Sequence, residues 1–373
     1  MIKIIGLQLG KTYENLSSLR YGSVMIMTDQ DVDGSHIKGL VINFFNNFFV
    51  SLFKYPGFLK QFITPIVKCR KKKEVVEFYS LPDFKAFIEN NVGWSIKYYK
   101  GLGTSNDEEG KEYFRNIDRN SIDFSYEDEV DHTCIDLLFN KKKSDQRKDW
   151  INSCDQQVSL DYKVDQIRYK DFIDKELIHF SVYSNQRSIP SMIDGLKPGQ
   201  RKIIFSCFKR KLNKEIKVAQ LSGYISEHSA YHHGEMSLQA TIVGMAQDFV
   251  GTNNINLLMP NGQFGSRGLG GKDSASSRYI YTTLNPITRL IFHPKDDALL
   301  QYLLDDGKKV EPKYYVPIIP MVLVNGAQGI GTGWSTSIPQ YNPRDIIANL
   351  MRKLEGGQFE RMVPFYKGFT GTI

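Results

Sequence analysis

A short apolar run, an acidic turn and an amphipathic stretch constrain the fold of this chain more than any other feature. Residues 23–27 (SVMIM) suit one buried strand, and the acidic turn TDQDVDG follows at residues 28–34. Residues 35–53 then carry apolar side chains at helical spacing. Strand, polar loop and helix in this order form one α/β unit, in which ligands bind at the carboxyl ends of the strands. The acidic turn lies at that place.

The length and composition of the chain limit the class of protein to which it can belong. The chain has 373 residues, 41% of them hydrophobic, which is enough for buried cores and excludes a disordered chain. At roughly 150 residues per domain, we expect two or three domains. No apolar run reaches the ~18–20 residues of a membrane span, so we expect no membrane partner. The four cysteines form no C-x-x-C pair, so neither a zinc site nor a disulfide framework is expected.

The charges are segregated, although the net charge is only +7. Residues 197–217 carry eight basic side chains and one acidic one, and residues 140–148 form a second basic cluster. Residues 105–131 instead carry ten acidic and three basic side chains. Focused positive charge is what a phosphate backbone requires, so the basic segments predict contact with nucleic acid. The alternative is that each run is a solvated helix face.

The second half of the chain differs from the first in its predicted secondary structure. Residues 200–211, 216–228 and 234–249 have helical periodicity with short breaks between them, which is typical of a helix-turn-helix module. Residues 314–324 predict a strand. Residues 325–334 (NGAQGIGTGW) predict a turn-rich loop.

Three aspartates alternate in the acidic turn, at Asp29, Asp31 and Asp33. In an extended chain they would point to one side, where their mutual repulsion is costly unless a cation lies between them. Oxygen ligands without histidine or cysteine favour Mg²⁺. An EF-hand loop opens with the same pattern but needs glutamate at its twelfth position, which is Leu40 here. A solvated acidic turn is the other alternative.

Two further motifs could carry chemistry. In SSRYIYT, the phenol of Tyr279 is a poor nucleophile at neutral pH, but the adjacent Arg278 could stabilise a phenolate and the charge on a phosphorus centre under attack. With 20 tyrosines in the chain, a purely structural Arg–Tyr pair is the alternative. In YHHGE, His232 and His233 diverge in direction, so we expect one to contact phosphate or carry a proton and the other to pack.

Six motifs occur in a fixed order: TDQDVDGSHIKG, IKYYKGLGTS, RSIPSMIDGLKPGQRK, AYHHGE, SRYIYT and NGAQGIGTGWST. On these motifs the chain resembles the breakage-reunion core of eukaryotic DNA topoisomerase II, a type IIA family, over nearly its full length. The resemblance implies an α/β plus α+β fold in four parts. They are the C-terminal part of a Rossmann-like Toprim domain at 1–125, linker helices at 126–185, a winged-helix domain with the helix-turn-helix at 186–318, and the beginning of a tower domain at 319–373.

The resemblance also implies roles for single residues. Tyr279 would attack a DNA phosphodiester and keep the 5′ phosphate as a phosphotyrosine, while Arg278 would stabilise the pentacovalent transition state. Asp29 and Asp31 would bind Mg²⁺, with Asp33 as the third acid of the cluster. The positions expected to contact DNA, from the resemblance or from the basic segment, are Arg147, Lys148, Arg187, Lys197, Arg201, Lys202, His232, His233 and Ile330.

Two of these positions carry a more specific expectation. His233 would grip the scissile region and is counted with the catalytic residues. Ile330 would insert between base pairs from its glycine-rich loop and bend the duplex, at a cost of a few kcal/mol per step.

The chain departs from the family pattern at its start. The Toprim motif E-G-D-S-A, whose glutamate is a metal ligand and proton carrier in the family, is absent, as are the ATPase domain, most of the tower and the dimer gate. We therefore expect a fragment of an ATP-dependent, homodimeric, nuclear enzyme. These 373 residues alone are expected to cleave DNA poorly or not at all.

Two other functions stay open. The missing glutamate and gates favour a truncated fragment that binds double-stranded DNA without cleaving it. A bacterial gyrase-type protein is disfavoured by AYHHGE and by the joining of Toprim and winged-helix parts in one chain, because the bacterial enzymes place them on two separate polypeptides.

Overall fold

The computed structural model describes residues 1–155, 158–305 and 307–373. The chain divides into two compact units, unit 1 at Met1–Ser184 and unit 2 at Asn185–Ile373. Both units mix helices with short strands, which confirms the mixed α/β class. Within the described residues, no helix combines the length and apolar character that crossing a membrane demands.

The elements of unit 1 are α1 (Ile2–Ile5), β1 (Val24–Met27), α2 (Val32–Phe48), α3 (Val50–Phe53), β2 (Leu59–Phe62), β3 (Val67–Lys71), β4 (Glu74–Phe78), α4 (Leu81–Asn90), β5 (Ser95–Tyr98), η1 (Leu102–Thr104), α5 (Asp107–Arg115), α6 (Ile117–Asn120), β6 (Ser121–Ser125), α7 (Glu129–Phe139), η2 (Lys141–Lys143), α8 (Ser144–Asn152), β7 (Gln166–Arg168), α9 (Tyr169–Phe172), the π-helix η3 (Ile173–Leu177) and α10 (Ile178–Ser188), which continues into unit 2. The elements of unit 2 are α11 (Pro198–Arg210), β8 (Ile216–Lys217), α12 (Val218–His228), α13 (Glu235–Ala246), η4 (Arg267–Leu269), β9 (Tyr281–Thr282), α14 (Thr288–Ile291), η5 (Pro294–Ala298), β10 (Tyr302–Asp305), β11 (Lys308–Pro312), α15 (Met321–Val324), β12 (Ala327–Ile330), β13 (Ser335–Ile338) and α16 (Pro343–Leu354).

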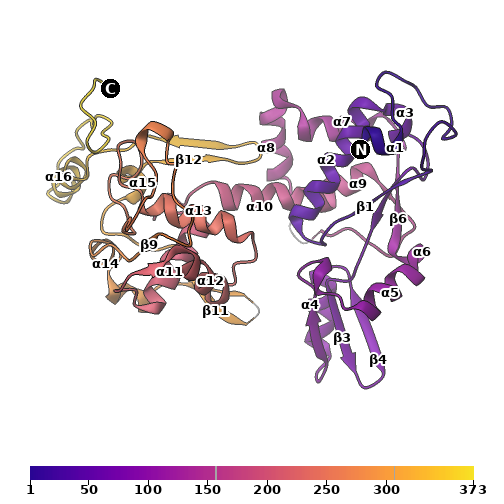
Figure 1. Ribbon diagram of the computed structural model, residues 1–373, viewed down its shortest axis with the longest axis horizontal. Helices are drawn as coiled ribbons and strands as arrows, with labels where there is room; N and C mark the ends of the chain where they lie inside the picture. Colours follow the sequence, from indigo (N-terminus) through magenta and orange to yellow (C-terminus); the bar gives the residue numbers. More distant parts are fainter. Residues whose placement is uncertain (156–157, 306) are drawn as a thin grey trace. The chain divides into compact units, whose positions relative to one another are not determined.

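Unit 1 is built on a four-stranded sheet in the order β1–β2–β6–β7. Figure 1 labels two of its strands, β1 and β6. Strands β1 and β2 are parallel, β2 and β6 antiparallel, and β6 and β7 parallel. The chain crosses from β1 to β2 through α2 and α3, as parallel pairing requires. The predicted strand and the predicted helix are therefore confirmed. Strand residues such as Ile26 and Phe124 share one core with Phe45 of α2 and Phe172 of α9.

The segment after β6 packs on the same core. Strand β7 extends the sheet, and the ring of Tyr169 stacks on Phe53 and Phe124 with centroids 4.2 Å and 5.5 Å away. Beside them, Lys38 of α2 and Glu176 of η3 form a buried ion pair at 2.5 Å. These contacts join the segment to unit 1, while the division of the chain into four domains stays a prediction.

A second, antiparallel sheet in unit 1 has the strand order β4–β3–β5. Val67, Cys69 and Phe78 of this sheet pack against Phe84 of α4 in a small core of their own. The loop after β5 leads into α5, so this sheet and α5 hold the ends of the KGLGTS segment.

Unit 2 contains the three helices that the periodicity predicts, as α11, α12 and α13. Their apolar faces meet in one core that includes Ile204, Leu221 and Ile242, each fully buried. Pro198 stands in the first turn of α11, where its missing N–H costs nothing. The strands β8 and β9 form a short antiparallel pair beside these helices.

Two predictions for unit 2 are wrong. Residues 314–324 form no strand, because Pro317 and Pro320 cannot donate to a ladder, and the segment ends in the helix α15. Residues 325–334 are not merely looped, because β12 pairs with β13 in an antiparallel hairpin. Ile330 is the last residue of β12 and lies opposite Ser335.

Candidate functional site

The acidic turn joins β1 to α2. Asp31 is the N-cap of α2, and its side chain accepts a hydrogen bond from the Gly34 N–H at 2.7 Å. Asp33 lies in the first helical turn, where a negative charge is favourable near the positive end of the helix dipole. The expectation that three carboxylates alternate along an extended chain is therefore wrong for Asp33, because α2 begins at Val32.

Asp29 is held by a second segment that sequence reasoning missed. The Leu102 N–H donates to Asp29 Oδ1 at 2.6 Å. A Cβ at Gly101 would lie 3.1 Å from the same oxygen, so this peptide approaches the carboxylate closely. Gly34 is confined more tightly, since a Cβ there would lie 2.0 Å from the backbone oxygen of Asp29. In the sequence, the glycines of the KGLGTS and TDQDVDG motifs were the signal that could have indicated this close approach.

The donor chemistry of the acidic turn fits Mg²⁺, which prefers carboxylate oxygens. Among the described residues, no group of three or more His, Cys, Asp or Glu side chains is arranged to hold a metal ion. Mg²⁺ does not require such a group, because it usually keeps several waters and binds through one or two carboxylates and a substrate phosphate. Asp29 and Asp31 each use one oxygen for a backbone N–H, and this leaves a second carboxylate oxygen on each side chain.

Tyr279 stands on an anchored turn and its side chain is 71% exposed. Its N–H donates to the Ser276 carbonyl at 2.8 Å, and the neighbouring Ile280 is buried. The Ile280 carbonyl also accepts from Val218 N–H at 3.1 Å, which fixes the turn to α12. The Arg278 guanidinium lies 5.8 Å from the centre of the Tyr279 ring. The phenol is therefore presented to solvent beside a cation, on a backbone that is held on both sides.

The two histidines of YHHGE are both exposed and make different contacts. His232 Nε2 lies 3.7 Å from a carboxylate oxygen of Asp305. The His233 ring packs edge-to-face on Tyr231, with centroids 5.4 Å apart. The two side chains thus contact different groups, and their roles stay a prediction.

Arg201 and Lys202 require a correction. Arg201 is 6% exposed and its guanidinium binds Asp194 at 2.7 Å and 3.0 Å. Lys202 Nζ binds the Ser229 carbonyl at 2.6 Å and Glu311 at 2.9 Å. Both side chains are used inside unit 2, so we do not include them among the residues proposed to contact DNA. Helical periodicity could have placed Arg201 on the inner face of α11.

The other predicted DNA contacts lie nearer the surface. Arg147 donates to the carbonyls of Leu137 and Asn140 at the end of α7, and Lys148 pairs with Asp145 at 2.7 Å. The remaining two are half-buried, Arg187 in the last turn of α10 and Lys197 at the N-cap of α11.

Ile330 has 85% of its surface exposed, which is unusual for isoleucine. The hairpin that carries it is fastened to α10, because Asn185 Nδ2 donates to the Thr332 carbonyl at 3.0 Å. A large apolar side chain is thus held in solvent on an anchored hairpin, as an inserting side chain requires.

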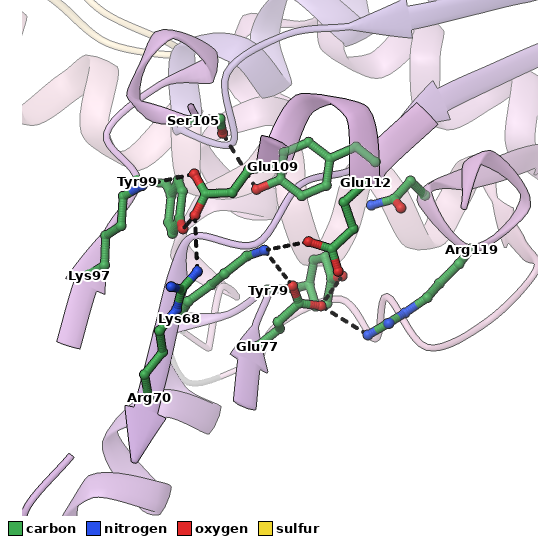
Figure 2. A network of polar contacts seen from close by, with 12 residues as sticks. Lys68, Arg70, Glu77, Tyr79, Lys97, Tyr99, Ser105, Glu109, Glu112 and Arg119 are labelled. Carbon is green, nitrogen blue, oxygen red and sulfur yellow. Dashed lines mark hydrogen bonds and ion pairs between the residues drawn. The ribbon is translucent and has the colours of Figure 1, made fainter. Parts of the chain in front are cut away.

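A buried network around Glu109 was also missed (Figure 2). The carboxylate accepts hydrogen bonds from the Tyr99 hydroxyl and from Lys97 Nζ at 2.8 Å. The sequence offered one signal, the N-x-x-E pattern of a capping box at Asn106 and Glu109, and the structure contains that box.

Comparison with known families matches both units. The sequence model for the A subunits of DNA gyrase and topoisomerase IV matches residues 187–373, half of the chain. The chain belongs to the type IIA DNA topoisomerase family. The model for the "C-terminal associated domain of TOPRIM" matches residues 62–185. The resemblance to type IIA topoisomerases that the six motifs indicate is therefore confirmed.

Individual relatives agree with this membership of the type IIA topoisomerases. DNA topoisomerase 2 of Arabidopsis thaliana is 59% identical over 377 residues, which cover 100% of this chain and 26% of the relative. DNA topoisomerase 2 of Candida albicans is 54% identical over 382 residues, covering 100% and 26%. The crystal structure of the Plasmodium falciparum topoisomerase II DNA-binding, cleavage and re-ligation domain superposes with a TM-score of 0.81 at 52% identity, covering 100% of this chain and 51% of that one. The chain thus spans about a quarter of the length of the curated relatives it matches.

Proposed function

We propose that this chain contributes to an ATP-dependent type II DNA topoisomerase that cleaves both strands of a duplex, passes a second duplex through the break and reseals it. The observation that carries the proposal is the exposed phenol of Tyr279 beside Arg278 on an anchored turn. Membership of the family, and relatives named DNA topoisomerase 2, support it.

In the proposed reaction, the Tyr279 hydroxyl gives up its proton to solvent as its oxygen attacks a backbone phosphorus atom. A P–O bond to tyrosine forms, the bond from phosphorus to the 3′ oxygen breaks, and the 3′ oxygen takes up a proton as it leaves. Phosphodiester is exchanged for phosphodiester, so the reverse attack by the 3′ hydroxyl reseals the strand. Arg278 stabilises the charge on the equatorial oxygens in both directions. His233 is proposed to hold the phosphate next to the scissile bond.

Asp29 and Asp31 are the proposed ligands of Mg²⁺, with Asp33 supplying further negative charge. The ion would stabilise the leaving oxygen or anchor the neighbouring phosphate. Asp31 also caps α2, and the hydrogen bond from the Gly34 N–H restricts the orientation of its carboxylate.

The remaining predictions are kept as part of the proposal. Helices α11–α13 with β8 and β9 would form the winged helix, and residues 319–373 the start of a tower. The proposed DNA contacts are Arg147, Lys148, Arg187, Lys197, His232, His233 and, as an inserting wedge, Ile330. We also propose homodimer formation, ATP binding by parts of the enzyme outside these 373 residues, and a nuclear location, since the relatives are eukaryotic DNA topoisomerases.

Covalent trapping of end-labelled DNA tests the proposal. The chain, its Tyr279→Phe variant and its Tyr281→Phe variant are mixed with duplex DNA and Mg²⁺, denatured with detergent and separated by size. Tyr281 is the matched control, because it is also exposed but lies in β9, opposite Lys217 of β8. Because these 373 residues alone are expected to cleave DNA poorly, we expect a weak adduct that needs Mg²⁺ in the wild type and in Tyr281→Phe, and none in Tyr279→Phe.

A gel shift on the same samples distinguishes the second candidate function. A wild-type chain that shifts DNA but forms no adduct under any Mg²⁺ concentration would be a non-catalytic DNA-binding fragment. An adduct that persists in Tyr279→Phe would remove Tyr279 as the nucleophile.

A further inference from the structure

The carboxylate of Glu109, in the first turn of α5, is the centre of a buried network (Figure 2). Its side chain is 5% exposed and contacts Lys97, Tyr99 and, at 3.5 Å, Arg70. The Asn106 N–H donates to it at 3.0 Å. Burial by itself raises the pKa of Glu109, but the hydrogen bonds from Lys97 and Tyr99 outweigh burial and lower that pKa to about 2. Glu109 is therefore a fixed negative charge.

The groups that bind Glu109 stand at both ends of one loop. Lys97 lies in β5, Tyr99 follows that strand directly, and Asn106 precedes α5. The loop of residues 100–105 lies between them. The Asn106 side chain accepts a hydrogen bond from the Glu109 N–H at 2.9 Å, so the two residues form a reciprocal capping box at the start of α5. Separating the loop ends would leave a buried carboxylate short of partners, which is costly.

The same loop places one peptide on Asp29. Leu102 N–H is 2.6 Å from Asp29 Oδ1, and a Cβ at Gly101 would lie 3.1 Å from that oxygen, so the carboxylate would have to shift to accommodate it. Residues 100–105 and Asp29 come from different elements, so the hydrogen bond depends on where the loop is held. Glu109 is the charged group that holds it.

We propose that Glu109 is a positioning residue for Asp29: it fixes the Gly101–Leu102 peptide and thereby the orientation of the Asp29 carboxylate toward a divalent cation. The proposal rests on the function above, in which Asp29 is a Mg²⁺ ligand. Groups that orient a metal-binding side chain typically account for roughly 10–100-fold in metal affinity.

The test compares Glu109→Gln with Glu77→Gln in the full chain. Glu77 is a matched control, since it lies on the same sheet and pairs with Lys68 at 2.7 Å and Arg119 at 3.0 Å, which lie outside the 100–105 loop. Mn²⁺ affinity is measured by electron paramagnetic resonance, and hydrogen exchange of residues 100–105 by mass spectrometry. We expect Glu109→Gln to speed exchange in the loop and to weaken Mn²⁺ binding by about 10-fold, and Glu77→Gln to do neither.

The Asp29→Asn variant distinguishes a failure of the positioning role from a failure of the cation site. If it weakens Mn²⁺ binding while Glu109→Gln changes neither readout, the positioning role is overturned and the cation site stands. If Asp29→Asn leaves Mn²⁺ affinity unchanged, the Asp29 ligand assignment fails and the positioning role fails with it. If Glu109→Gln does not fold, Tyr99→Phe takes its place, because it removes only one donor from the network. We then expect the same changes in hydrogen exchange and Mn²⁺ affinity, but smaller.

Discussion

Asp29 is the residue at which separate parts of unit 1 meet. It follows β1 in sequence, its backbone oxygen confines Gly34, and its carboxylate accepts from Leu102. The alternation of acids in the sequence draws attention to Asp29, but nothing in the pattern names its partner 73 positions away in the chain. Long-range contacts of this kind follow from topology and not from local spacing.

Adding one methyl group to the loop tests this contact. Gly101→Ala places a Cβ 3.1 Å from Asp29 Oδ1, tighter than ordinary contacts, so we expect the carboxylate to shift and Mn²⁺ binding to weaken severalfold. Gly103→Ala is the control, because a Cβ there meets no described atom within 4 Å. Calorimetric titration with Mn²⁺ measures both. Equal affinities for the two variants would contradict the proposed geometry.

The ionised state of Glu109 predicts a pH dependence. Its pKa of about 2 lies below the usual value near 4.3, so the stabilisation it gives is fully present above about pH 4.5 and is lost as the pH falls toward 2. The lowered pKa corresponds to about 3 kcal/mol between the two limits. We expect the difference in free energy of unfolding between wild type and Glu109→Gln to shrink over that range in urea titrations. A difference that stays constant from pH 6 to pH 3 would contradict this account.

Among the elements, α2 connects the acidic turn to the rest of unit 1. Its Ser35 hydroxyl donates to Glu176 at 2.7 Å, and its Lys38 binds Glu176 and, at 2.9 Å, Gln61 of β2. Glu176 stands on the π-helix η3, a rare local geometry that often occurs at functional sites. One buried pair therefore ties the helix that carries Asp31 to a strand and to a second helix.

Breaking this pair has a predictable cost. Glu176→Leu leaves the Lys38 charge buried and unpaired, so we expect a loss of about 3–5 kcal/mol in the free energy of unfolding. Lys38→Met combined with Glu176→Leu removes both charges and should recover most of that loss. Thermal and urea unfolding curves of the three proteins measure it. A double variant no more stable than Glu176→Leu would show that the charges themselves are not the source.

Elements whose apolar residues recur at a regular spacing could be predicted from the sequence. The elements that were predicted wrongly have physical reasons. The helices of the helix-turn-helix region and the strand β1 follow from apolar spacing alone. The strand expected at residues 314–324 fails because its prolines remove ladder donors. The β12–β13 hairpin was hidden by glycines that disfavour strands on average, although Gly329 is buried in β12 opposite Thr336.

For the candidate site residues, sequence patterns predict which residue types could carry the chemistry, but they predict less well what surrounds each side chain. Tyr279 and Ile330 are exposed as a nucleophile and a wedge require. Arg201 belongs to the same basic segment as exposed lysines but faces Asp194 inside the unit. Charge counts along the chain cannot separate these two cases, because burial depends on which face of α11 meets the core.

At the scale of the whole molecule, a net charge of +7 conceals local excess. If the segment at residues 197–217 contacts DNA phosphates, each contacting lysine releases about one counterion. We expect Lys211→Gln to reduce the slope of log affinity against log salt concentration by about 0.9. Lys85→Gln, on α4 and outside the basic segments, should leave the slope unchanged. Fluorescence anisotropy at several salt concentrations measures both, and equal slopes would contradict a phosphate contact at Lys211.

The central claim is that Tyr279 becomes covalently bonded to DNA. Mass spectrometry of nuclease-trimmed adducts, formed with Mg²⁺ and digested with protease, tests it most directly. The account predicts a nucleotide linked through its 5′ phosphate to the peptide that contains Tyr279, and an unmodified Tyr281. A nucleotide on any other residue, or an adduct of the same yield in Tyr279→Phe, would contradict it.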